Sequence, residues 1–141
     1  MGNTDSHAGK PLSETSKLKT ILVVDDEEPV RNLLTTFLEK KGYMTADVET
    51  GPLALALLNI FKPHMVLLDI RMAGMDGLET LKKIKNHDPD LPVIMVTGEN
   101  DDKTAREAME NGALDYITKP FNLEQLQTNL TIHLMLLDDQ R

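Results

Sequence analysis

Apolar positions along the chain alternate between two patterns. Short runs in which almost every residue is apolar are followed by longer stretches in which apolar residues recur every three or four positions. A continuous apolar run predicts a strand that is covered on both faces, whereas the three-and-four spacing predicts a helix with one apolar face. Strands are predicted at residues 20–24, 43–48, 65–69, 93–97 and 116–119.

Each predicted strand is followed by a predicted helix. In the first helix the apolar positions are Val30, Leu33, Leu34, Phe37 and Leu38, with Pro29 suited to its first turn and Gly42 to its end. The other helices are predicted near 51–61, around Leu78, Leu81 and Ile84, near 101–111, and from Asn122 onwards. Five strand–helix units predict an α/β fold, with a doubly wound five-stranded parallel sheet and helices on both of its faces.

The first nineteen residues have a different composition. They are rich in Ser, Thr, Gly and Lys and hold only isolated apolar residues, so burial cannot offset the entropy lost on ordering. Residues 1–19 are therefore expected to be a flexible tail. The remainder, 20–141, is expected to form one domain, because a chain of 141 residues can bury one core.

Charge and composition narrow the classes of function. Lys and Arg total 15 against 23 Asp and Glu, a net charge of −8, which repels nucleic-acid phosphates and anionic lipid surfaces. Direct binding to nucleic acid or to a membrane is therefore not expected. The chain has no cysteine, and its N-terminus lacks the apolar core of a signal peptide, so a cytoplasmic location is predicted.

Polar side chains stand at the carboxyl ends of four predicted strands. They are Asp25 and Asp26 after the first strand, Asp69 at the third, Thr97 at the fourth and Lys119 at the fifth. Ligands of open α/β sheets bind outside these ends. A single aspartate here is often only a turn former or a helix cap. Three neighbouring carboxylates, however, repel one another unless they are protonated or share a cation, so one polar site is predicted at this rim.

Mg²⁺ suits this predicted cluster, because carboxylates, a backbone carbonyl and retained waters are the ligands of a small hard cation. We expect Asp26 and Asp69 to bind the ion, Asp25 to orient a water ligand, and the backbone carbonyl of Arg71 to complete the site. Mn²⁺ is the alternative ion for the same ligands.

Four segments, in this order and at these separations, resemble the receiver domain of two-component response regulators: ILVVDDEEPVRNLL, MVLLDIRMAGMDGLE, VIMVTG and GALDYITKPF. The resemblance covers about residues 19–135. It implies a flavodoxin-like fold with strand order 2-1-3-4-5. It also implies a signalling phosphoacceptor rather than an enzyme, which promotes its own phosphorylation and slow dephosphorylation. The implied donor is a sensor histidine kinase or a histidine phosphotransfer protein.

The resemblance also implies a role for each residue at the rim. Asp69 matches the phosphoacceptor, and Asp25 and Asp26 match the acidic pair that holds Mg²⁺. Thr97 and Lys119 match the hydroxyl and the cation that contact the phosphoryl group. These types suit the chemistry, because a transferring phosphoryl group needs its negative charge met by a metal, a cation and a hydrogen-bond donor.

Further positions match residues around the phosphoacceptor. Tyr116 matches an aromatic residue that moves inward with the threonine, and Pro120 matches the residue after a cis peptide bond. Arg71 and Glu99 stand two residues after the phosphoacceptor and the threonine, at positions that tune hydrolysis of the acyl phosphate. Ala73 departs from the family, in which many members have proline at this position.

Two acidic residues follow the predicted metal-binding pair. Glu27 and Glu28 are assigned to the helix entrance, where a negative charge complements the helix dipole. They are left out of the predicted site.

The last predicted helix is a candidate contact surface for partner proteins. Leu123, Leu126, Leu130, His133 and Leu137, with Leu134 and Leu136 beside them, form a stripe that continues almost to the end of the chain. The stripe is interpreted as packing against the first helix, with a dimer seam or a connector to an output domain as alternatives. In the family, the face built by the fourth helix, fifth strand and fifth helix binds targets or a second receiver. The implied partners are therefore an effector or output domain, or a second copy of the chain through this face or the last helix.

Two other functions remain open from the sequence. The first is a receiver-like adaptor that binds partners without phosphorylation, which the complete set of five rim residues argues against. The second is a flavodoxin-like binder of a nucleotide or flavin. The acidic segment DDEEPV after the first strand argues against it, because it repels phosphate unless a metal intervenes.

Overall fold

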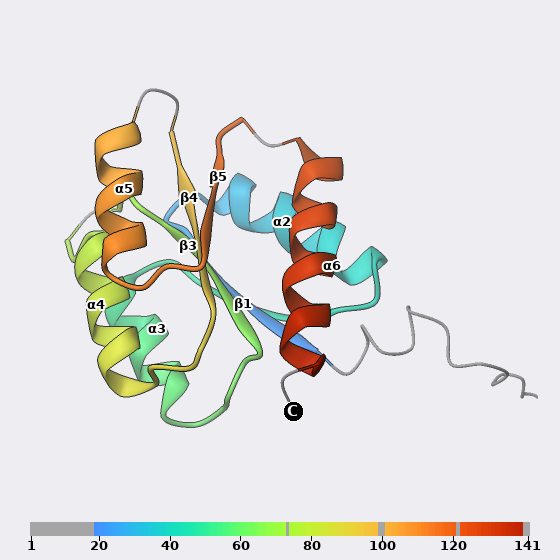
Figure 1. The fold of residues 1–141 in the computed structure, drawn as a ribbon, viewed down its shortest axis with the longest axis horizontal. Helices are drawn as coiled ribbons and strands as arrows, with labels where there is room; N and C mark the ends of the chain where they lie inside the picture. The colour runs from blue at the N-terminus through green and yellow to red at the C-terminus, as the bar shows by residue number, and fades with distance from the viewer. Residues whose placement is uncertain (1–18, 73, 99–100, 121, 140–141) are drawn as a thin grey trace, which may run out of the picture.

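Five parallel strands form one sheet in the order β2-β1-β3-β4-β5 (Figure 1). The structure is a computed structural model. It describes residues 19–72, 74–98, 101–120 and 122–139, and side chains are described up to residue 136. Both the doubly wound α/β class and the strand order 2-1-3-4-5 are thereby confirmed. Among the described residues, no helix combines the length and the apolar character needed to cross a bilayer.

The elements follow the predicted alternation of strand and helix. The strands are β1 (Thr20–Val24), β2 (Met44–Val48), β3 (Met65–Asp69), β4 (Val93–Thr97) and β5 (Asp115–Thr118). The helices are α2 (Glu28–Lys40), α3 (Gly51–Leu58), α4 (Gly77–His87), α5 (Asp102–Glu110) and α6 (Leu123–Asp139). The largest difference is at α3, predicted to reach residue 61. It ends earlier because the N–H groups of Asn59 and Ile60 bond to the carbonyls three residues before them, those of Ala56 and Leu57, as in a 3₁₀ turn.

The central strands are buried on both faces, as their continuous apolar runs predict. Every residue of β3 and β4 is buried, and so is all of β1 except Thr20. The two edge strands differ, because each has only one neighbouring strand and is only partly covered. Met44 of β2 is 60% exposed and Tyr116 of β5 is 40% exposed. The rule for continuous apolar runs therefore holds for the three central strands, and the edge strands, whose sequences mix apolar and polar residues, are only partly covered.

The helices divide between the two faces of the sheet. Figure 1 shows α2 and α6 on one side and α3, α4 and α5 on the other. On the first side, Leu34 and Leu38 of α2 belong to the same buried cluster as Leu126 and Leu130 of α6. The two helices thus contribute to one buried cluster on the same face of the sheet, as the interpretation of the apolar stripe as core packing predicts. Leu33 lies off this face and is 46% exposed.

The structure separates the predicted stripe of α6 into buried and exposed positions. Leu134 is buried, whereas the ring of His133 lies at the flank of the helix, 3.3 Å from Asp115 Oδ2. These two residues are adjacent in the helix and therefore point in different directions. The rotation of α6 about its own axis decides which of them enters the core. Ile132, Met135 and Leu136 are exposed. Leu137, also in the predicted stripe, has a side chain outside the described part.

The parallel sheet positions the site. All five strands run in one direction, so their carboxyl ends meet along one rim. The register pairs Val24 of β1 with Leu68, Asp69 of β3 with Val96, and Thr97 of β4 with Thr118. Residues that are far apart in sequence therefore leave the sheet at the same level.

The loop between β3 and α4 folds back tightly on the end of β3. The N–H of Gly77 donates to the Ile70 carbonyl at 2.8 Å. A Cβ at Gly77 would overlap the carbonyl oxygen of Asp69 and would lie 2.5 Å from Ile70 Cα. These are backbone atoms, which cannot move aside as a flexible side chain would. Only glycine therefore allows α4 to begin this close to the end of β3.

Gly77→Ala is expected to lower the free energy of unfolding by about 1–3 kcal/mol, the usual cost of overpacking a close contact. Urea denaturation of the purified protein measures this change. Gly98→Ala is the matched control, because a Cβ there has no atom within 4 Å, and its effect should stay below about 1 kcal/mol. Equal stability of the Gly77 variant and the wild type would contradict the tight packing of this loop.

Candidate functional site

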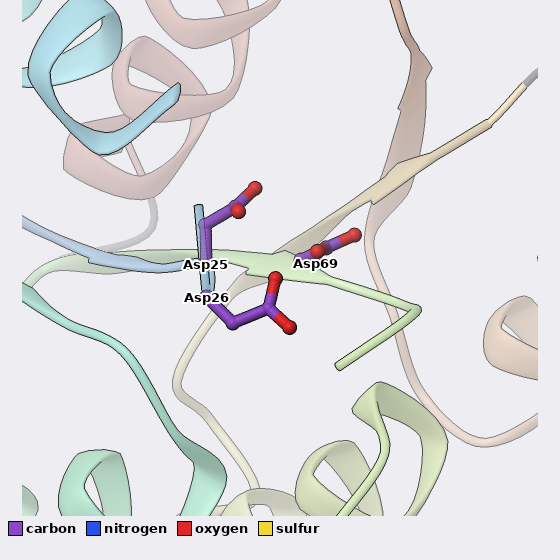
Figure 2. A group of neighbouring side chains, drawn as sticks. All are labelled: Asp25, Asp26 and Asp69. Atoms are coloured by element: carbon purple, nitrogen blue, oxygen red, sulfur yellow. The ribbon is translucent and has the colours of Figure 1, made fainter. Parts of the chain in front are cut away.

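Three carboxylates meet at the rim of the sheet. Asp25 and Asp26 directly follow β1, and Asp69 is the last residue of the neighbouring β3 (Figure 2). Each offers an oxygen, and these oxygens all lie within 4.8 Å of one another. Asp25 is 1% exposed and Asp69 is 5% exposed, whereas Asp26 is exposed. The structure thus brings together the three aspartates singled out from the sequence.

Asp25 is held by bonds to both its backbone and its side chain. Its N–H donates to the Val48 carbonyl at 3.2 Å. Its Oδ1 accepts the Glu27 N–H at 2.9 Å, and its Oδ2 lies 3.1 Å from Lys119 Nζ. These bonds compensate the burial of the charge, because a buried carboxylate is tolerated when it is paired and hydrogen-bonded.

Asp69 is an electrostatically strained carboxylate. Burial, followed by the neighbouring charge of Asp25, raises its pKa, while Lys119 and the N–H of Arg71 lower it, and the net effect is a rise from 3.8 to about 6. Its Oδ1 accepts that N–H at 3.3 Å, and its Oδ2 is 3.7 Å from Lys119 Nζ. Like charges at this distance favour protonation or a bound cation.

The donor set fits a small divalent cation. Three carboxylate oxygens within 4.8 Å of one another are hard ligands of the type that Mg²⁺ and Mn²⁺ prefer. Beside them a cavity of about 440 Å³ is lined in part by Asp26, Arg71 and Asp76. Water ligands and a small phosphodonor therefore have room next to the carboxylates.

Lys119 connects the carboxylates. Its Nζ lies 3.1 Å from Asp25, 3.4 Å from Glu27 and 3.7 Å from Asp69. Burial by itself lowers the pKa of Lys119, but the three surrounding carboxylates outweigh burial, and the pKa is raised. The residue lies just beyond β5, where its N–H donates to the Thr97 carbonyl at 2.7 Å. The ammonium therefore remains charged across the physiological pH range.

Thr97 ends β4 on the same rim. Its side chain is buried, with 3% of the residue exposed. The hydroxyl makes a long hydrogen bond of 3.4 Å to the neighbouring Gly98 carbonyl. A bond of this length is weak, so the hydroxyl can exchange it for a stronger acceptor with little cost.

The remaining predicted site residues lie around this centre. Tyr116 is an exposed residue of β5, and the Lys119–Pro120 peptide bond is cis. The Arg71 side chain is 74% exposed and extends to Asp101, with its Nε and Nη2 each 3.1 Å from Asp101 Oδ2. Glu99 lies outside the described residues, and so does Ala73.

Two contacts at the site were missed from the sequence. Glu27 was assigned to the helix dipole, but its side chain makes no capping bond and instead lies near Lys119. Its place directly after the acidic pair, at the same sheet rim as Lys119, was a usable signal. Arg31 of α2 donates through Nη1 to the Asp25 carbonyl at 2.8 Å. No sequence spacing indicates that contact.

Comparisons with known proteins agree with this geometry. The family model described as the response regulator receiver domain matches residues 21–131. Regulatory protein AtoC of Escherichia coli (strain K12) is 42% identical over 109 residues, which are 77% of this chain and 24% of that protein. Sporulation initiation phosphotransferase F of Bacillus subtilis (strain 168) is 37% identical over 107 residues, which are 76% of this chain and 86% of that protein.

Solved structures show the same likeness. A CheY-like response regulator receiver domain protein from Methanospirillum hungatei superposes with a TM-score of 0.83 at 30% identity, covering 88% of this chain and 99% of that one. The chain spans between a quarter and a half of the length of the first curated relatives that it matches. The match to the family model covers most of the chain, and the fold and the acidic rim agree with it. The chain therefore belongs to the receiver-domain family of two-component response regulators.

Proposed function

We propose that this receiver domain accepts a phosphoryl group on Asp69, in a Mg²⁺-dependent reaction, from the phosphohistidine of a sensor histidine kinase or a histidine phosphotransfer protein. One observation carries the proposal. The Asp69 carboxylate is buried beside the Lys119 ammonium and two other carboxylates, at a rim that also holds the Thr97 hydroxyl. A nucleophile, a cation, a hydroxyl donor and a metal-binding set are thus present together.

The chemistry assigns a role to each of these groups. A carboxylate oxygen of Asp69 attacks the phosphorus, and the phosphorus–nitrogen bond breaks with its electron pair leaving on the imidazole, which takes a proton from solvent. Asp25, Asp26 and Asp69 would hold Mg²⁺, which would supply positive charge to offset the negative charge of the phosphoryl group. Lys119 and Thr97 supply a fixed cation and a hydroxyl for the charge that develops on the phosphoryl oxygens.

The protonation state of Asp69 sets a lower pH limit for the reaction. Only the carboxylate is a nucleophile, and burial together with the charge of Asp25 raises the pKa of Asp69 to about 6 in the absence of a metal ion. At pH 7 and above most molecules carry the charged form. A cation bound at the site would act in the opposite direction and lower this pKa, because it favours the charged form.

The added charge is the signal in this proposal. Formation of an acyl phosphate replaces the single negative charge of the Asp69 carboxylate with about two on the phosphoryl group and adds acceptor oxygens, which attract the Thr97 hydroxyl and the Lys119 ammonium. When Thr97 moves at the end of β4, the face formed by α5, β5 and α6 shifts towards its alternative arrangement. Tyr116 moves inward in the same change. We assign binding of an effector, an output domain or a second copy of the chain to that face. Arg71 and Glu99 tune the hydrolysis that ends the signal.

Phosphorylation by a small phosphodonor tests the proposal. The wild type, incubated with acetyl phosphate and Mg²⁺, is expected to gain one phosphoryl group in intact-protein mass spectrometry and to lose it with hydroxylamine. Asp69→Asn should gain none. Asp88→Asn is the matched control, because it changes a carboxylate in the loop after α4, remote from the acidic rim, and it should react as the wild type does.

The other outcomes are equally informative. If neither the wild type nor the variants are phosphorylated, the phosphoacceptor function is contradicted. The receiver-like adaptor function is then the remaining alternative. Equal phosphorylation of the wild type and Asp69→Asn would place the acceptor elsewhere. Borohydride reduction followed by peptide mapping identifies the modified aspartate directly.

A further inference from the structure

We propose that Arg31 is a positioning residue for the metal-binding carboxylates, acting through the backbone of Asp25 and held in place by Asp47. The inference rests on the proposed function, because it concerns the Mg²⁺ site. It assigns a role to a residue that contacts neither the phosphoacceptor nor the predicted metal ligands through their carboxylates.

Arg31 joins three parts of the structure. From α2, its Nη1 donates to the Asp25 carbonyl at 2.8 Å. Its Nε donates to Asp47 Oδ2 of β2 at 3.0 Å. The side chain of Arg31 is 14% exposed, against 42% for Asp47. One guanidinium therefore ties the loop after β1 to both the first helix and the edge strand.

The bond to the Asp25 carbonyl controls Asp26. The peptide group is planar, so a donor that fixes the direction of the Asp25 carbonyl also fixes the plane from which Asp26 continues. The N–H of Asp25 is fixed by Val48 and its carboxylate by Glu27 and Lys119. Arg31 provides the remaining bond, to the carbonyl. It thereby limits the rotation of the exposed Asp26 carboxylate relative to Asp69.

A guanidinium is suited to this position. Its planar fork presents several N–H groups in fixed directions and stays charged at any physiological pH. Arg31 uses two different nitrogens, Nε for Asp47 and Nη1 for the Asp25 carbonyl, whereas lysine at this position would have to reach both acceptors from one nitrogen. The pair of contacts therefore depends on arginine itself.

Charge and position predict opposite effects on metal binding. Arg31 carries a positive charge near three carboxylates, so a purely electrostatic role predicts that its removal strengthens the binding of a divalent cation. A positioning role predicts that removal weakens binding, because the loop then samples orientations in which Asp26 does not face Asp69. The sign of the change decides between the two.

Calorimetric titration of the full chain with MgCl₂ measures this sign. For Arg31→Ala we expect the Kd for Mg²⁺ to rise about tenfold, the size of effect typical for the loss of a hydrogen bond that involves a charged group. Arg31→Lys should lie between Arg31→Ala and the wild type. At saturating Mg²⁺ the rate of phosphorylation by acetyl phosphate should return close to the wild-type plateau, since the variant shifts the metal dependence rather than the chemistry.

The role of Asp47 is tested by a double-variant cycle. Asp47→Ala should weaken Mg²⁺ binding by less than Arg31→Ala, about two- to threefold. In the Arg31→Ala background it should have no further effect, because both changes break the same link. Additive effects would mean that Asp47 acts on the cation through its own charge, and would overturn this part of the inference.

Folding is checked by thermal unfolding and by amide spectra of each variant. A folded Arg31→Ala protein that binds Mg²⁺ as tightly as the wild type, or more tightly, overturns the positioning role. So does a loss of the rate plateau at saturating Mg²⁺. If Arg31→Ala does not fold, Arg31→Lys decides by the same sign. A wild type that binds no Mg²⁺ overturns the proposed function instead, which keeps the two failures distinct.

Discussion

Asp69→Asn is expected to abolish phosphorylation and, in metal-free buffer at pH 7, to raise the free energy of unfolding by about 2–3 kcal/mol. The second effect follows from the pKa of Asp69, which is raised from 3.8 to about 6 by burial and by the charge of Asp25. Each pKa unit corresponds to about 1.4 kcal/mol between the two protonation states. Asparagine removes the buried charge and keeps an oxygen to accept the Arg71 N–H.

The raised pKa of Asp69 makes the stability of the wild type depend on pH, and the direction of this dependence shows why the variant is more stable. Between pH 3.8 and about 6 the folded protein binds the Asp69 proton more tightly than the unfolded chain does. The stability of the wild type therefore falls as the pH rises through this range. Below pH 3.8 both states are protonated and the variant gains nothing. The difference in the free energy of unfolding between the variant and the wild type should increase from pH 4 to pH 6 and stay constant above about pH 7.

Urea denaturation across this pH range measures the difference. Added Mg²⁺ should close it, because a cation binds the wild-type carboxylates and stabilises the folded state by mass action. Asp88→Asn again serves as the control, with no pH-dependent gain expected. A difference between Asp69→Asn and the wild type that is independent of pH would contradict the electrostatic account of Asp69.

Lys119→Met is expected to slow phosphorylation by acetyl phosphate by about 100-fold or more at saturating Mg²⁺. The ammonium lies 3.7 Å from the Asp69 carboxylate, where it meets the negative charge of the transferring phosphoryl group. Removing one such stabilising group from a transition state typically costs about two to three orders of magnitude in rate. Stopped phosphorylation time courses followed by mass spectrometry provide the rate.

Metal binding should change in the opposite direction. Lys119 Nζ lies within 4 Å of Asp25, Glu27 and Asp69, so its loss leaves these carboxylates without their shared cation. Mg²⁺ should then bind several-fold more tightly to Lys119→Met than to the wild type, because a nearby positive charge no longer repels it. A slower reaction with tighter metal binding cannot result from unfolding.

Two variants complete this experiment. Lys119→Arg keeps the charge but changes its shape, and should recover part of the rate. Lys82→Met removes an exposed lysine of α4 and should leave both the rate and the Kd unchanged. Reaction of Lys119→Met at the wild-type rate would contradict the role assigned to the ammonium.

The Arg31 inference and the Lys119 prediction together separate two uses of positive charge at this rim. Both cations lie close to Asp25, but Arg31 bonds to its backbone and Lys119 to its carboxylate. Loss of Arg31 should weaken Mg²⁺ binding, and loss of Lys119 should strengthen it. The partner atom, rather than the charge, decides the sign.

The sequence by itself determined the alternation of strands and helices, the parallel sheet and the acidic rim. These features depend on the burial of short apolar runs and on the rule that parallel strands end at one edge. Asp25, Asp26 and Asp69 follow directly, since each stands at the end of a run. The strand order came from the resemblance to receivers, because apolar patterns do not specify which strands are neighbours.

Only the tertiary structure decided which side chains meet across that rim. Glu27 reaches Lys119, Arg31 bridges Asp25 and Asp47, and Arg71 turns towards Asp101. These partners come from different elements, and their contact depends on side-chain conformation and on the rotation of each helix over the sheet. Neither quantity is encoded in the spacing of residues along the chain. The same rotation places Leu134 rather than His133 in the core.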